Sequence, residues 1–222
     1  MMTISYRFVV IVAIFITSLI TANIIAVKVV DFGSVFLPAA IIIFPLSYIF
    51  GDILTEVYGY SWARRVIWLG FACNLIFVGF AWLGQQLPAA PFWEGQGAYE
   101  SILGYAPRLL VASFSGYLVG EFANSSILAK MKILTQGRWL WARTIGSTVV
   151  GQGLDSSIFI TLAFIGTPVF EPEMILYHWL AKTAIEALAT PLTYAAVNYL
   201  KKKEAVDTYD YKTKFNPFAI RG

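Results

Sequence analysis

The chain contains 222 residues, of which 58% are hydrophobic and 13% are charged, and its formal net charge is +3 at pH 7. Soluble domains carry about 25% charged residues, so this composition argues against a soluble enzyme of this length. The basic residues form no patch suited to binding nucleic acid. We therefore predict a protein that spans a lipid bilayer.

Runs of about 17 to 25 mostly apolar residues predict membrane-spanning helices. In chain order the predicted spans are Phe8 to Val30, Val35 to Val57, Arg65 to Leu87, Pro107 to Leu128, Trp139 to Ile165 and Met174 to Tyr199. The expected fold class is an all-α integral membrane protein with six transmembrane helices. Residues 1–200 form this domain, and residues 201–222 form a polar cytoplasmic tail.

The distribution of basic residues predicts the orientation of these helices, because loops rich in Lys and Arg stay in the cytoplasm. Basic residues mark alternate ends of the spans, namely Arg7, Arg64, Arg65, Lys130, Lys132, Arg138 and Lys201 to Lys203. The intervening loops carry Asp31, Glu94, Glu100, Glu171 and Glu173 instead. Both termini are therefore expected in the cytoplasm. The loop from Gln85 to Tyr105, rich in Pro and Gly, is expected outside, where it could cover a site.

A ten-residue motif occurs twice, as VGEFANSSIL at residues 119–128 and as VGQGLDSSIF at residues 150–159. Each copy places Glu121 or Gln152 three residues before Asn124 or Asp155, which keeps both polar groups on one helical face. Consecutive spans run antiparallel, so the copies point inward from opposite sides, as in transporters built from inverted repeats. We predict an inverted pseudo-repeat around a central site; chance repetition in apolar helices is the alternative.

Ionisable side chains lie inside the predicted spans, where they are costly and usually functional. The carboxylates are Asp52, Glu56, Glu121, Asp155 and Glu186, and their polar companions are Asn23, Asn74, Asn124, Gln152, Arg143 and Lys182. Arg64, Arg65 or Arg143 could neutralise Asp52 and Glu56 near the cytoplasmic end. Lys182 and Glu186, one turn apart, could form an intrahelical pair.

Small and aromatic residues indicate how the spans pack. Gly116 and Gly120, like Ser147 and Gly151, recur at four-residue spacing, which is typical of closely packed helices. Pro45, inside the second predicted span, is expected to kink a helix. Phe44 and Tyr48 lie about two turns and one turn before Asp52, respectively, and could offer a ring on which a flat ligand stacks.

Several of these segments resemble the bacterial queuosine-precursor transporters, which are classed with the vitamin-uptake transporters. The resemblance rests on ANIIAVK from Ala22, FPLSYIFGDILTEVYGY from Phe44, GFACN from Gly70, VGEFANSSILAKMK from Val119, GQGLDSSIF from Gly151, KTAIEALATPLTY from Lys182 and FNPF from Phe215. It covers nearly the whole chain. It implies a multi-pass protein of the bacterial inner membrane that imports 7-cyano-7-deazaguanine, 7-aminomethyl-7-deazaguanine or both.

The residues of this chain suit such a cargo. A guanine-like base presents an N1–H beside an exocyclic amine, and one carboxylate can accept both hydrogen bonds. Amides can complement the O6 carbonyl, and an aromatic ring can stack on the base. The expected substrate-binding residues are Phe44, Tyr48, Asp52, Asn74, Glu121, Asn124, Gln152, Asp155, Lys182 and Glu186. No catalytic residue, metal or cofactor is expected.

Other readings stay open. The six-helix architecture resembles the substrate-binding subunits of energy-coupling-factor importers, which act with a separate ATPase. GQGLD around Asp155 distantly resembles an intramembrane aspartyl protease, although its spacing differs from that class. The chain has no GxxxxGK[ST] loop for ATP hydrolysis, so transport by facilitated diffusion and transport by proton coupling are both open. Homodimerisation through the small-residue faces is open as well.

Overall fold

The computed structural model describes residues 5–31, 36–104, 107–166 and 170–219. The elements in chain order are α1 (Tyr6–Ile25), β1 (Val29–Asp31), β2 (Phe36–Pro38), the 3₁₀-helix η1 (Ala39–Ile42), α2 (Phe44–Ile53), the π-helical turn η2 (Leu54–Tyr58), α3 (Tyr60–Gln86), α4 (Gln96–Leu103), α5 (Pro107–Leu134), α6 (Leu140–Phe164) and α7 (Glu173–Glu204). The chain is mostly helical, as its composition predicts.

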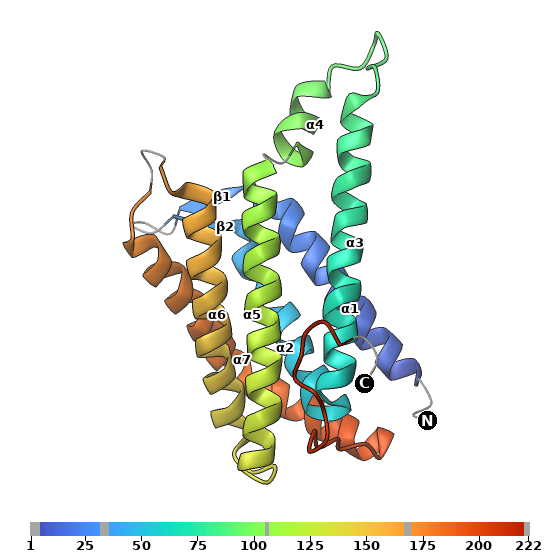
Figure 1. Cartoon of the computed structure of the whole chain (residues 1–222). Coiled ribbons are helices and arrows are strands. Elements are labelled where there is room, and N and C mark those ends of the chain that lie inside the picture. The colour runs from blue at the N-terminus through green and yellow to red at the C-terminus, as the bar shows by residue number, and fades with distance from the viewer. Residues whose placement is uncertain (1–4, 32–35, 105–106, 167–169, 220–222) are drawn as a thin grey trace.

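The long helices run between the two ends of one bundle (Figure 1). At one end, which we call the terminal end, Arg7 Nη1 at the start of α1 lies 3.1 Å from Glu204 Oε1 at the end of α7. The turn η2 and the α5–α6 loop lie at this same end, whereas β1, β2, α4, the end of α6 and the start of α7 lie toward the other, the hairpin end (Figure 1). The connections therefore alternate between the two ends along the chain.

The segment predicted as a second continuous span departs from expectation. The predicted start, Val35, lies outside the described residues, and Phe36–Pro38 instead pairs antiparallel with Val29–Asp31 as a two-stranded hairpin. This hairpin is an addition to the expected all-α class. Pro45 does not kink a helix but stands in the first turn of α2, where its missing N–H leaves no hydrogen bond unmade.

The predicted external loop also contains regular structure. The helix α4 lies within it and packs against the end of α3, where the Tyr99 hydroxyl donates to the Ala81 carbonyl oxygen at 3.0 Å. Tyr105, the predicted end of this loop, lies outside the described residues. Between α3 and α4 a surface cavity of about 320 Å³ is lined by residues that include Phe92, Trp93 and Tyr99.

Two helices within the described residues, α1 and α3, are long and apolar enough to cross a membrane, with mean hydropathies of 2.6 and 2.1. Polarity is reversed relative to a soluble protein, because large apolar side chains are exposed while charged side chains are buried. Leu188 is 82% exposed and Phe80 is 70% exposed, whereas Asp52, Arg143 and Glu121 are almost fully covered. Such a distribution suits a molecule whose outside faces lipid.

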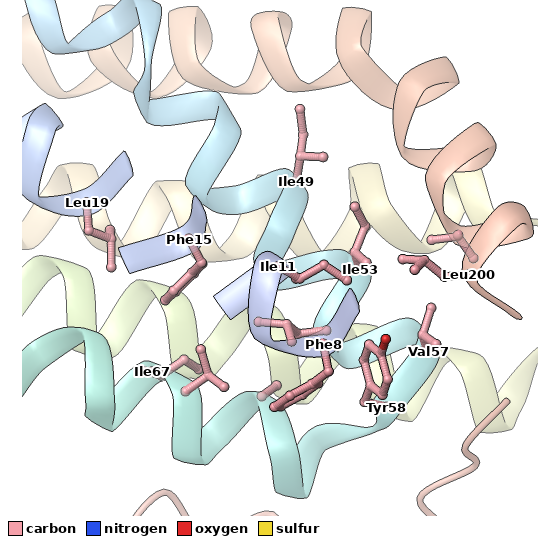
Figure 2. Close-up of a cluster of buried hydrophobic side chains, with 14 of the residues drawn as sticks. Phe8, Ile11, Phe15, Leu19, Ile49, Ile53, Val57, Tyr58, Ile67 and Leu200 are labelled. Carbon is pink, nitrogen blue, oxygen red and sulfur yellow. The ribbon is translucent and has the colours of Figure 1, made fainter. Parts of the chain in front are cut away.

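An apolar cluster fills the bundle between α1, α2 and α3 (Figure 2). Four residues at helical spacing, Phe8, Ile11, Phe15 and Leu19, line one face of α1 and meet Ile49 and Ile53 of α2 among other apolar side chains. Lipid tails are as apolar as these side chains, so close packing rather than escape from water holds this part together. The helix α2 also contacts α5 and α7, on the side where the polar residues gather.

Candidate functional site

The two copies of the repeated motif lie against each other where α5 crosses α6. A Cβ built on Gly120 would stand 2.7 Å from Asp155 Cβ, and one built on Gly151 would stand 2.8 Å from Asn124 Cβ. Because Gly120 matches Gly151 and Asn124 matches Asp155 in the repeat, the contact is reciprocal. The predicted close packing of these glycines is confirmed, and it brings Asn124 and Asp155 deep into the bundle.

Around this crossing lies a group of buried polar side chains from α2, α5, α6 and α7, which we call the central polar cluster. Its members are Tyr48, Asp52, Glu121, Asn124, Thr148, Gln152, Asp155, Lys182 and Glu186. Asn124 Nδ2 donates to Asp52 Oδ1 at 2.8 Å, and Thr148 Oγ1 donates to Glu186 Oε1 at 2.5 Å. Most of the side chains predicted for the site therefore come together from distant parts of the sequence.

The pairing of Lys182 differs from the intrahelical pair that the sequence offered. Lys182 Nζ donates to Asp155 Oδ2 at 2.5 Å, while Glu186 is hydrogen-bonded by Thr148 and Gln152 of α6. The reason is that Lys182 and Glu186 both face α6. There Asp155 lies beside Lys182, and the donors Thr148 and Gln152 lie beside Glu186. Lys182 Nζ also lies 3.9 Å from the centroid of the Phe44 ring.

Several hydrogen-bond acceptors of the central polar cluster have no donor among the described residues. They include both carboxylate oxygens of Glu121, Oε2 of Glu186, Oδ1 of Asn124 and Oε1 of Gln152. The Tyr48 hydroxyl likewise has no partner in this part of the chain. Buried polar groups are normally hydrogen-bonded, so an excess of unpaired acceptors is typical of a site whose partner is a ligand or water.

The two aromatic candidates lie beside this group. The Phe44 and Tyr48 rings are tilted by 36° with centroids 5.4 Å apart, and Tyr48 is fully buried. A Cβ on Gly120 would lie 3.2 Å from the Tyr48 hydroxyl, so this glycine lets the phenol approach α5. A flat ligand held by the carboxylates would thus have aromatic surface within the same part of the bundle.

Asn74 stands apart from the carboxylates. Its Oδ1 accepts a hydrogen bond of 2.6 Å from Asn23, and its Nδ2 donates to the Gly70 carbonyl oxygen at 3.0 Å. Both amides line a cavity of about 30 Å³ that also touches Phe44 and Tyr117. Such a volume can hold a water molecule but is far below the roughly 300 Å³ at which pockets for small ligands begin.

A second set of charges, the terminal-end network, consists of the buried Glu56, Lys132 and Arg143, the partly buried Lys201 and the exposed Asp207. Arg143 Nη1 donates to Glu56 Oε2 at 2.7 Å, and Lys201 Nζ donates to Glu56 Oε1 at the same distance. Lys132 Nζ lies 3.5 Å from Glu56 and 2.5 Å from Asp207. Of the expected partners for Glu56, the structure confirms Arg143, and it adds the two lysines.

Arg64, which the sequence offered as a partner for Asp52 and Glu56, binds the polar tail. Its Nη1 donates to the carbonyl oxygens of Lys214 and Asn216 at 3.0 and 2.9 Å, and Trp68 Nε1 donates to the Pro217 carbonyl oxygen at 2.8 Å. The tail therefore folds back against α3. Burial raises the pKa of the Asp207 carboxyl, but hydrogen bonds from Lys132 and Lys201 outweigh this effect and hold that pKa below its ordinary value.

Sequence reasoning did not include Thr148, which bonds Glu186, or the contribution of Lys132 and Lys201 to Glu56. Thr148 lies four residues before Gln152, so the helical face of the motif extended by one turn contains it. No comparable signal existed for the lysines, because their partner lies more than 70 residues away along the chain. Within the described residues, no group of three or more His, Cys, Asp and Glu side chains could hold a metal ion.

Comparison with known proteins decides the family. A family model described as "Putative vitamin uptake transporter" matches residues 38–196, which is most of the chain and includes every member of the central polar cluster. The chain belongs to this family. The match confirms the resemblance read from the motifs at Phe44, Val119 and Gly151.

Two curated relatives carry matching names. A "Probable queuosine precursor transporter" of Bacillus subtilis (strain 168) is 29% identical over 83% of this chain and 82% of its own length. The "Queuosine precursor transporter" of Escherichia coli (strain K12) is 26% identical over 62% of this chain and 58% of its own length. No solved structure matches the chain significantly. The family and both relatives are transporters, so this protein is a membrane transporter and not an enzyme.

Proposed function

We propose that this protein imports queuosine precursors, 7-cyano-7-deazaguanine, 7-aminomethyl-7-deazaguanine or both, across the bacterial inner membrane through the central polar cluster. The observation that carries the proposal is the excess of buried acceptors at Glu121, Glu186, Asn124 and Gln152. A deazaguanine brings the donors that these atoms lack, because its N1–H and its exocyclic amine lie side by side. The names of both relatives point to the same cargo.

Binding and release follow from how the cluster is assembled. Asp52 belongs to α2, Glu121 to α5, Gln152 to α6 and Glu186 to α7, so a base held among them contacts four separate helices. A small relative movement of those helices would then open or close the site toward one end of the bundle. In this proposal the ion pairs around Glu56 hold the terminal end closed.

The orientation of the bundle follows the distribution of basic residues. Arg7, Lys130, Arg138 and Lys201 to Lys203 belong to the terminal end, so that end lies in the cytoplasm together with both chain termini. The helices α1, α3, α5, α6 and α7, together with the segment of η1, α2 and η2 from Ala39 to Tyr58, then serve as six transmembrane spans. The hairpin β1–β2 and the helix α4 face the outside.

The test is uptake by the purified chain in liposomes that contain no other protein. Radiolabelled 7-cyano and 7-aminomethyl bases are offered with guanine as a competitor, and empty liposomes serve as the control. Saturable uptake of either deazaguanine by the chain alone is the expected result. If a folded protein binds the bases but transports them only with an added ATPase, it acts as a substrate-binding subunit. If a folded protein binds none of the bases, queuosine precursors are not its substrates.

A further inference from the structure

The central polar cluster has an unbalanced formal charge. It contains the carboxylates Asp52, Glu121, Asp155 and Glu186 but one basic side chain, Lys182, in the described part of the chain. Lys182 is committed to Asp155 at 2.5 Å. Three formal negative charges are thus left without a paired cation among the described residues, in a buried part of the bundle.

The nearby buried cations are occupied elsewhere. Arg143, Lys132 and Lys201 all lie within 3.5 Å of Glu56, and both lysines also contact Asp207. Arg64 donates to carbonyl oxygens of the tail. Buried carboxylates are costly unless they are protonated or paired, so this imbalance leaves a place for a proton or for a cation supplied from outside the chain.

Glu121 provides a second, independent observation. Its side chain is completely buried, and neither carboxylate oxygen has a hydrogen-bond donor among the described residues. It lies within electrostatic range of Asp155 and Glu186 and against the backbone of α2 at Gly51. Glu186, by contrast, already accepts hydrogen bonds from Thr148 and Gln152 and keeps one free oxygen, and Asp52 accepts from Asn124.

We propose that this site selects a cationic base, and that Glu121 is the residue that binds the ammonium group of the cargo. The inference rests on the proposed function and narrows it. Of the two expected precursors, the 7-aminomethyl base carries an amine that is protonated near neutral pH. The 7-cyano base is neutral at the same position and presents a nitrogen that only accepts.

The two edges of the aminomethyl base match the two kinds of acceptor in the cluster. Its N1–H and exocyclic amine need one carboxylate with its oxygens side by side, whereas its ammonium, carried on the five-membered ring, needs another carboxylate at a different edge. Asp52 or Glu186 can serve the first edge while Glu121 serves the second. A nitrile facing the Glu121 carboxylate would gain no hydrogen bond and would leave both oxygens unpaired, which lowers its affinity.

The experiment compares equilibrium binding of the two bases to the purified full-length protein by calorimetry at neutral pH. The wild-type protein is expected to bind the 7-aminomethyl base at least about 10-fold more tightly, the difference expected for one charge-assisted hydrogen bond over none. Glu121→Gln should bring the two affinities to within about 3-fold of each other, mainly by weakening the aminomethyl base. Glu173→Gln, which removes an exposed carboxylate at the start of α7, should leave the preference unchanged.

The outcomes separate this inference from the proposed function. Equal wild-type affinities, or tighter binding of the cyano base, would overturn charge selection while leaving a queuosine-precursor transporter in place. If Glu121→Gln keeps the wild-type preference, or if it weakens the binding of both bases equally, the assignment of the ammonium contact to Glu121 would be overturned. Failure of the folded wild-type protein to bind either base would overturn the proposed function and this inference together.

Discussion

Gly120 of α5 and Gly151 of α6 each stand where any side chain would collide with the other helix. A Cβ on Gly120 would lie 2.8 Å from the Gly151 carbonyl oxygen, and a Cβ on Gly151 would lie 2.9 Å from the Gly120 carbonyl oxygen. Distances under 3.0 Å are almost never found for real Cβ atoms, so the backbones meet directly. The same contact places Asn124 and Asp155 on opposite sides of the crossing, within the central polar cluster.

Gly120→Ala should therefore separate α5 from α6 and lower stability by about 1 to 3 kcal/mol, the usual cost of overpacking. Uptake should fall as well, because Asp155 and Tyr48 both lie against this glycine. Gly79→Ala is the matched control, since a Cβ at this helical position meets nothing within 4 Å. Thermal unfolding in detergent compares the two, and equal melting temperatures would contradict the close crossing.

Asp155→Ala should abolish uptake while the protein still inserts into the membrane, because the variant removes a carboxylate of the site and the partner of Lys182. Breaking a buried ion pair from one side costs about 3 to 5 kcal/mol. Lys182→Met should cost a similar amount, and Asp155→Ala combined with Lys182→Met should cost clearly less than the sum. Strict additivity of the unfolding free energies, or normal uptake by Asp155→Ala, would show that the pair does not have this role.

Glu56→Gln should be among the most destabilising polar substitutions in the chain. It leaves the buried Arg143 without its carboxylate and leaves Lys132 and Lys201 with Asp207 alone, with an expected loss of about 3 to 5 kcal/mol. Glu204→Gln is the control, because its partner Arg7 is an exposed side chain, and surface pairs contribute little. A small effect of Glu56→Gln in thermal unfolding would argue against a buried network at this end.

Acidification should weaken the attachment of the tail. The pKa of Asp207 is below its ordinary value in the folded protein, so this carboxylate binds protons more readily after unfolding. Its stabilising contribution is fully present above the unfolded pKa of about 3.9 and is lost as the pH falls through the folded pKa. Wild type and Asp207→Asn should therefore differ in melting temperature at neutral pH and converge below about pH 3. A difference that stays constant down to that pH would refute the assignment.

The sequence predicted several helices well, and its errors have local causes. The spans expected at Phe8, Arg65, Trp139 and Met174 correspond to α1, α3, α6 and α7 within a few residues at most ends. The second span failed as one continuous helix because Pro38 and Pro45 supply no backbone N–H where a helix would need one, so a hairpin and a 3₁₀ turn precede α2. The predicted pairing of Lys182 with Glu186 was wrong because spacing along one helix cannot show that a neighbouring helix places Asp155 beside Lys182.

The sequence by itself determined the membrane character, the helical class, the family and the set of buried carboxylates, since composition and motifs are local properties that need no contacts to be recognised. Only the tertiary structure decided how those charges are distributed. Helix packing places Arg143, Lys132 and Lys201 beside Glu56 and Lys182 beside Asp155, and no cation of the described residues pairs with Glu121. The energy of a buried charge depends on which neighbours lie within a few ångströms, and residues far apart in the chain supply those neighbours.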